Sequence, residues 1–146
     1  MQPQLHINML AILAATAASF VFAFLWHGPL FGKTWARLMK VPMDVKPTMK
    51  MMLPALAWTL VGTFLTAYVM TFTGEIWRPS VWDRGADQPG YVYGILNGFW
   101  IWLGFYIPMQ LSAVSWEQRP WGLFFLNSTF YLLNLQLIAQ ILANWR

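Results

Sequence analysis

The chain has 146 residues, of which 58% are hydrophobic and 10% charged, with a formal net charge of +4 and no cysteine. A soluble domain carries roughly 25% charged residues, so this chain has too few to cover a surface that faces water. We expect lipid to be its main solvent, and the lack of cysteine excludes disulfides, thiolate nucleophiles and cysteine-based metal sites.

Four stretches are long and apolar enough to cross a bilayer as helices. A span needs about 20 mainly apolar residues, since each residue adds about 1.5 Å across a hydrocarbon core about 30 Å thick. Four stretches without Asp, Glu, Lys or Arg meet this requirement: Ile7–Trp26, Met51–Thr73, Tyr91–Ala113 and Trp121–Asn144. We therefore predict an all-α integral membrane protein, a four-transmembrane-helix bundle in which residues 1–146 form a single domain.

The first span is expected to remain in the protein as a helix. It lacks a basic segment before it, and its apolar part is longer than the 7–15 residues of a signal peptide. Ala11, Ala15 and Ala18 form a stripe of small residues along it. Such a stripe favours close packing against another helix.

The stretch WHGPLFGKTW follows this span and is expected to end it. Gly28 and Pro29 disfavour a continuing helix, which would leave His27 at headgroup depth as an anchor. A role for His27 as a ligand or catalyst is the alternative. Residues Gly32 to Lys40 can then form a short amphipathic helix that lies in the membrane interface.

The connection between the first two spans holds most of the positive charge. Against a single Asp44 it carries five basic residues: Lys33, Arg37, Lys40, Lys46 and Lys50. Because cytoplasmic loops carry an excess of Lys and Arg, we predict that loop 27–50 is cytoplasmic and that both termini lie outside. The basic residues then face anionic lipid headgroups, which disfavours nucleic acid as a partner.

Seven of the ten tryptophans fall at or just beyond the ends of the predicted spans. The indole ring favours that depth, because its body is apolar and its N–H can reach the headgroups. We therefore predict interfacial anchors at Trp26, His27, Trp35, Trp77, Trp82, Trp116, Trp121 and Trp145.

The connection GEIWRPSVWDRGADQPG carries three carboxylates, on Glu75, Asp83 and Asp87. Carboxylate oxygens suit calcium or magnesium, but this spacing matches no known cation-binding loop. Arg78 and Arg84 can pair with these acids instead. We predict no metal site here.

The third span contains a series of glycines at helical spacing: Gly90, Gly94, Gly98 and Gly104. Small residues four apart let helix backbones approach closely, and we expect this face to pack against the small-residue stripe of the first span. Pro108 cannot donate a hydrogen bond to the carbonyl of Gly104, so we also expect a kink there.

The fourth span has polar side chains on two nearly opposite faces. Asn127, Tyr131 and Asn134 share one face, and Gln136 and Gln140 lie on the other. Polar side chains in a membrane usually turn toward protein, so two such faces favour a contact outside the bundle. The candidate residues for contact with a partner or ligand are Asn97, Trp100, Asn127, Tyr131, Asn134, Gln136 and Gln140.

Two stretches of the chain are similar to those of a known family. FLWHGPLFGKTWARLM carries most of a W-Y-S-P-L-F-G-K-x-W signature, with His27 and Gly28 in place of Tyr and Ser. GILNGFWIWLGF and the residues after it follow a G-x-x-x-G-x-x-x-W-x-G-F span, a short loop and a last helix. Both resemble the small bacterial membrane proteins called domain of unknown function seventeen-sixty-one. The resemblance implies four spans and the bacterial inner (cytoplasmic) membrane, and it implies no activity.

The spans contain no Asp, Glu, Lys, Arg or His, which ion-coupled transporters generally keep within the membrane. HExxH, P-loop and GxGxxG motifs are also absent, and His27 and the acidic loop are expected at opposite faces of the membrane.

We therefore predict a protein without catalytic activity. It is expected to be an accessory or structural subunit of a larger membrane complex, of respiratory or photosynthetic type for example, or a self-associating bundle. The alternative is a binder or carrier of an apolar small molecule such as a lipid, quinone, carotenoid or other pigment; no other cofactor is predicted. Its expected partners are membrane lipids and other membrane subunits or a second copy.

Overall fold

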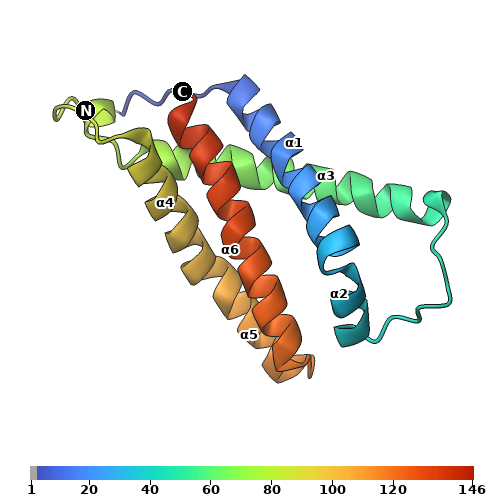
Figure 1. The fold of residues 1–146 in the computed structure, drawn as a ribbon. Helices are drawn as coiled ribbons and strands as arrows, with labels where there is room; N and C mark the ends of the chain where they lie inside the picture. The colour runs from blue at the N-terminus through green and yellow to red at the C-terminus, as the bar shows by residue number, and fades with distance from the viewer. Residues whose placement is uncertain (1–2) are drawn as a thin grey trace.

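The computed structural model describes residues 3–146, and all regular secondary structure in that range is helical. Four helical segments are long and apolar enough to cross a membrane: Met9–Leu30, Met49–Glu75, Gly90–Trp116 and Trp121–Asn144. The predicted all-α fold class with four spans is thus confirmed. The C-terminus, the start of the first helix and the connection before Gly90 lie at one end of the molecule, and the turn before Trp121 lies at the other (Figure 1).

Helix α1 (Met9–Leu25) continues past the point where the sequence predicted its end. It begins at Asn8, whose side chain accepts hydrogen bonds from the backbone of Leu10 and Ala11. A π-helical turn, η1 (Trp26–Leu30), then carries the chain through Pro29. The wider turn relieves the clash between a proline ring and the carbonyl four residues earlier, so Pro29 does not stop the helix.

Helix α2 (Gly32–Leu38) follows almost at once and extends the first span (Figure 1). A Cβ at residue 32 would lie 2.5 Å from the carbonyl oxygen of His27, so glycine is required at Gly32. The short helix predicted after the first span is therefore present. It packs against the start of the last helix, where Leu38 touches Gly122, and does not turn back across the first span.

Helix α6 (Trp121–Asn144) is the centre of the structure. It lies between α1 and α4 (Gly90–Ile101), and α3 (Met49–Glu75) crosses behind α1 and α6 (Figure 1). The predicted pairing of the first span with the third is wrong, because each of them packs on α6 instead. The core consists of small and aliphatic residues of α1, α3 and α6: Ala11, Ile12, Ala15, Ala67, Met70, Leu135, Ile138, Ala139 and Leu142.

The glycines of α4 bring that helix close to α6. A Cβ at Gly90 would lie 2.6 Å from the carbonyl oxygen of Ala143, so the two backbones meet there. At Gly94 and Gly98 an added Cβ would lie 2.7 Å and 2.8 Å from the side-chain amides of Gln140 and Gln136. These three glycines therefore give α6 and its long polar side chains access to the backbone of α4.

The third span is interrupted where Pro108 predicted a kink. Helix α4 passes into a π-helical turn, η3 (Trp102–Tyr106), before α5 (Ile107–Trp116). Such turns are a common cause of helix bending. Here the turn contains Gly104, whose carbonyl receives no hydrogen bond from residue 108 because proline has no backbone N–H. A Cβ at Gly104 would meet nothing within 4 Å, so this glycine does not serve helix packing as predicted.

Helix α3 packs on the other spans through its second half. Its buried residues are Ala67, Met70, Thr71 and Glu75. From Met49 to Gly62 every residue except Leu56 is exposed. The first half of α3 thus projects away from the remaining helices (Figure 1).

We expect Gly90→Ala to destabilise the protein, because its Cβ would collide with the backbone of α6 and force the two helices apart. The effect should be about 1–3 kcal/mol, measured as a lower unfolding temperature in detergent by circular dichroism. Gly104→Ala is the matched control, with open space around the new methyl group. Equal unfolding temperatures for the two variants would contradict the close approach at Gly90.

Candidate functional site

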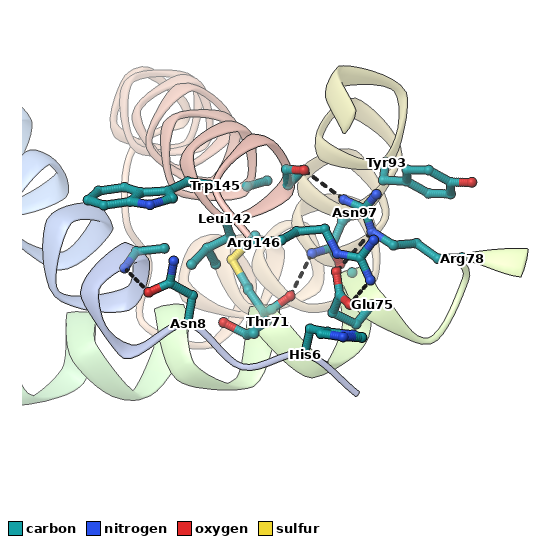
Figure 2. Close-up of a pocket in the computed structure, with 15 residues that line it drawn as sticks. His6, Asn8, Thr71, Glu75, Arg78, Tyr93, Asn97, Leu142, Trp145 and Arg146 are labelled. Carbon is teal, nitrogen blue, oxygen red and sulfur yellow. Dashed lines mark hydrogen bonds and ion pairs between the residues drawn. The ribbon is translucent and has the colours of Figure 1, made fainter. Parts of the chain in front are cut away.

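Four charged side chains gather at the end of the molecule where the C-terminus lies. We call them the terminal charge cluster: Glu75 of α3, Arg78 and Asp87 of the connection to α4, and Arg146 after α6. Figure 2 shows Glu75 below the guanidinium groups of the two arginines, with His6 next to it and Tyr93 on the far side of Arg78. Glu75 is 5% exposed and Arg78 is 3% exposed, so this ion pair is largely removed from solvent.

Arg78 connects three elements of the fold. Its Nε lies 2.9 Å from Oε1 of Glu75, although the N–H bond does not point at that oxygen. One Nη donates a 2.7 Å hydrogen bond to the carbonyl of Ala143 in the last turn of α6, where a positive charge complements the helix dipole. Its guanidinium also lies over the ring of Tyr93, 4.5 Å from the ring centre.

Arg146 closes the cluster from the C-terminal end. It donates to Oε2 of Glu75 at 2.8 Å and to Oδ2 of Asp87 at 3.1 Å. Asp87 in turn accepts hydrogen bonds from the backbone and hydroxyl of Ser80, at 2.9 Å and 2.8 Å. The cluster therefore ties the ends of α3 and α6 to the connection between α3 and α4.

The pKa of the Asp87 carboxyl reflects these contacts. Burial alone raises it, but the hydrogen bonds from Ser80 and the charges of Arg146 and Arg78 outweigh burial and hold the pKa below its ordinary value. Asp87 is thus a carboxylate at neutral pH. Two arginines neutralise it and Glu75, so this pair of acids is poorly suited to a metal cation.

A small cavity adjoins the cluster, between the first turn of α1, the second half of α3 and the ends of α4 and α6. The space open to the centre of a water molecule is about 10 Å³, room for about one water. Its polar walls include His6, Asn8, Thr71, Glu75 and Asn97 as well as both arginines of the cluster (Figure 2). This volume suits a bound water and excludes an organic substrate.

Arginine pairing was one of the alternatives left open by the sequence, and Arg78 takes that role while Arg84 stacks near Trp82 instead. The participation of Arg146 was missed, since it is distant in sequence from Glu75 and from Asp87. The spacing of Glu75 and Arg78, three residues apart, was the local signal for their pairing.

Three polar side chains on the two faces of α6 are paired within the chain. On one face Asn134 accepts a 2.8 Å hydrogen bond from Ser19 of α1. On the other, Gln136 and Gln140 each donate, at 3.1 Å, to backbone carbonyls of α4. The inference that two polar faces favour a contact outside the bundle is therefore wrong for Asn134, Gln136 and Gln140, because α6 lies between two other helices of the same chain.

The remaining candidate contact residues do not form one pocket. Asn97 is buried and bridges to α3, donating to the carbonyl of Met70 and accepting from the hydroxyl of Thr73, both at 2.9 Å. Trp100 is 60% exposed on the outer side of α4. Tyr131 packs against Tyr106 of η3 with the two rings tilted and their centres 4.6 Å apart.

His27 belongs to an aromatic cluster between η1, α2 and α6. Its Nδ1 lies 3.1 Å from the carbonyl oxygen of Ala23, and its ring meets Phe130 edge-on with centres 4.7 Å apart. Trp26 is 6% exposed and packs against Phe31, with ring centres 4.3 Å apart. Trp26 is therefore buried in protein and does not present its N–H to headgroups as predicted.

The other predicted anchors differ in exposure. Four are open to the surroundings: Trp77, Trp116, Trp121 and Trp145, with exposed fractions of 75%, 85%, 57% and 47%. Trp82 is half-buried and donates from Nε1 to the carbonyl of Ile76, and Trp35 is half-buried beside His27. Their placement at the membrane interface stays a prediction.

Four apolar helices of spanning length, joined by hydrogen bonds that polar side chains make to side chains and backbone carbonyls of neighbouring helices, define a multi-pass α-helical membrane protein. Residues 10–143 match the family described as Protein of unknown function (DUF1761), and the chain belongs to that family. No curated protein and no solved structure matches the chain at a significant level. The resemblance noted in the sequence is confirmed, and the family brings no activity with it.

Removing the guanidinium in Arg78→Gln should leave the buried Glu75 carboxylate with only one of its two cationic partners, Arg146. Breaking a buried ion pair from one side costs about 3–5 kcal/mol, so we expect a large drop in unfolding temperature in detergent. Arg84→Gln, an exposed arginine of the same connection, is the matched control and should change stability by about 0.5 kcal/mol or less. Similar losses in both variants would show that the cluster does not stabilise the fold.

Acid should weaken the terminal charge cluster through Asp87. Its pKa is lower in the folded protein than in the unfolded chain, so the unfolded chain takes up the proton more readily. The stability that Asp87 contributes is complete above its ordinary value of 3.8 and is lost as pH falls through the lower folded-state pKa. Thermal unfolding followed from about pH 6 to about pH 3 should show a smaller loss for Asp87→Asn than for the wild type. The exposed Asp83→Asn should behave like the wild type.

Proposed function

We propose that this chain is a membrane subunit without catalytic activity that associates with a helix of another membrane protein through the first half of α3. That helix belongs to a different subunit or to a second copy. The observation that carries the proposal is the exposure of α3 from Met49 to Gly62, which contacts little of its own chain. Asn134, Gln136 and Gln140 of α6 are paired within the chain, which leaves the exposed half of α3 as the surface for association.

Exposed apolar residues in a membrane can be covered by lipid, but Trp58 is not a typical lipid-facing residue. It is 75% exposed and lies about 14 Å along α3 from Met49, at a rise of 1.5 Å per residue. An indole N–H favours the interface or a hydrogen-bond partner over hydrocarbon. A large exposed aromatic side chain of this kind is typical of residues that dominate binding energy at interfaces.

Beside Trp58, α3 carries a face of small residues that begins in its exposed first half and ends just beyond it. Ala55, Thr59, Gly62 and Thr66 are spaced by three or four residues, and a Cβ at Gly62 would meet nothing within 4 Å. The hydroxyls of Thr59 and Thr66 donate to carbonyls of α3 itself, so they bring no unpaired polar group to the surface. Such faces allow a second membrane helix to approach closely.

We also place the chain in the bacterial inner membrane, with both termini outside and the connection between α1 and α3 in the cytoplasm. The support is the distribution of charge. Lys33, Arg37 and Lys40 line a hollow at the end of the molecule opposite the termini (Figure 1). Cytoplasmic ends of membrane proteins carry such an excess of basic residues.

One observation favours the second candidate function, binding of an apolar small molecule. A groove of about 370 Å³ runs between α3 and the bend of the third span. Its walls are almost wholly apolar, formed by Leu65, Thr66, Val69, Met70, Thr73, Ile101, Phe105 and Tyr106. A lipid, quinone or carotenoid tail fits such walls. Trp100 and Asn97, which the sequence suggested as lining residues, lie outside it.

Because the chain has no cysteine, a single cysteine introduced into α3 is the only thiol of the chain that a cross-linker can label. Thr59→Cys, labelled in native membranes with a photoactivatable maleimide, should give a protein adduct of one defined mass. Thr129→Cys on α6 is the matched control, since Thr129 is also exposed and its hydroxyl also bonds the carbonyl four residues earlier. The adduct mass distinguishes a different subunit from a second copy.

If Thr59→Cys and Thr129→Cys both gave lipid adducts alone, association through α3 would be wrong. The groove is tested separately, by organic extraction and mass spectrometry of the purified protein. Phe105→Ala opens the groove wall and should reduce any enriched apolar molecule, while recovery of bulk lipid alone would contradict that second function.

A further inference from the structure

We infer that a cleft between α5 and α6, at the end of the molecule opposite the termini, binds one phospholipid with a phosphoethanolamine headgroup. The cleft has a volume of about 270 Å³. It lies at the turn between α5 and α6, away from the exposed half of α3 (Figure 1). The inference is therefore independent of the association proposed through α3.

Two carboxamides face this cleft at matching depth. Gln110 lies six residues before Trp116, the last residue of α5, and Asn127 lies six residues after Trp121, the first residue of α6. At 1.5 Å per residue, each is about 9 Å inside its helix end. Within residues 3–146 neither side chain makes a hydrogen bond, whereas Asn97, Asn134, Gln136 and Gln140 are all paired.

Unpaired carboxamides are unfavourable at that depth, because little water is available to hydrogen-bond them. The ester carbonyls of a phospholipid are acceptors that lie just below the headgroup. The side-chain N–H groups of Gln110 and Asn127 can donate to them. The acyl chains then lie against the apolar walls of the cleft, which include Met109 and Phe124.

The mouth of the cleft carries one positive and one negative side chain. Arg119 Nε lies 3.3 Å from Oε2 of Glu117, and the exposed fractions of the two side chains are 38% and 62%. A Nη of Arg119 contacts the sulfur of Met39 at 3.4 Å, a weak acceptor that a phosphate oxygen would replace. The guanidinium is thus available for a phosphate, and the second carboxylate oxygen of Glu117 for a cation.

This pair of charges selects among headgroups. A phosphoethanolamine presents a phosphate to Arg119 and a hydrogen-bonding ammonium to Glu117. A phosphocholine has no N–H to donate to Glu117, and a phosphoglycerol brings a net negative charge beside it. The cleft therefore favours the zwitterionic lipid with a primary ammonium over both.

The test is native mass spectrometry of the full chain in detergent, titrated separately with dioleoyl phosphatidylethanolamine, phosphatidylglycerol and phosphatidylcholine. We expect one phosphatidylethanolamine to bind several-fold more tightly than the other two lipids. Arg119→Gln should weaken its binding about tenfold, equivalent to about 1.4 kcal/mol, because a charge-assisted hydrogen bond to the phosphate is lost. Glu117→Gln should remove the preference over phosphatidylcholine.

The carboxamides are tested with Gln110→Leu and Asn127→Leu, each of which should weaken phosphatidylethanolamine binding several-fold. The matched controls are Arg84→Gln and Gln88→Leu, two exposed polar residues outside the cleft, which should bind the lipid like the wild type. Unfolding temperatures verify that each variant is folded. Equal binding of the three lipids, or binding that is unchanged by Arg119→Gln and by both leucine variants, would overturn the inference.

Discussion

The arrangement of this protein depends on the need to pair polar side chains in a medium without water, and α6 is the helix where that need is greatest. Asn134 pairs with Ser19 of α1, and Gln136 and Gln140 donate to the backbone of α4. Each pair contributes about 0.6–2 kcal/mol in a membrane, less than the cost of leaving a carboxamide unpaired in hydrocarbon. Helix α6 therefore lies between α1 and α4, and the other helices are placed relative to it.

The terminal charge cluster extends the same principle to the end of the molecule. Helix α3 meets the others only through its second half, which ends at the buried Glu75. Arg78 and Arg146 hold it, joining Glu75 to the end of α6 and to Asp87. Helix α3 is thus attached to the other helices at its C-terminal end only, and for this reason its first half is exposed.

Much of the fold followed from local signals in the sequence. The lengths and apolar character of the four spans, the start of α1 near Asn8 and the irregularity before Pro108 depend on residues close together in the chain. The predictions were wrong where one local sequence feature is compatible with two different structures. Pro29 can end a helix or lie in a π-helical turn, and Trp26 can face headgroups or be buried against Phe31.

The sequence by itself determined that this is a four-span helical membrane protein of a recognisable family, because hydropathy, length and a short signature are properties of contiguous residues. The tertiary structure alone decided which polar face meets which helix. The glycines of α4 were visible as a packing face, but nothing local shows that glutamines of α6 approach them rather than alanines of α1. Which helices pair depends on the hydrogen-bond energies between residues some 40 positions apart, such as Gln136 and Ile95. These hydrogen bonds form only when the helices pack together, so no local stretch of sequence reveals them.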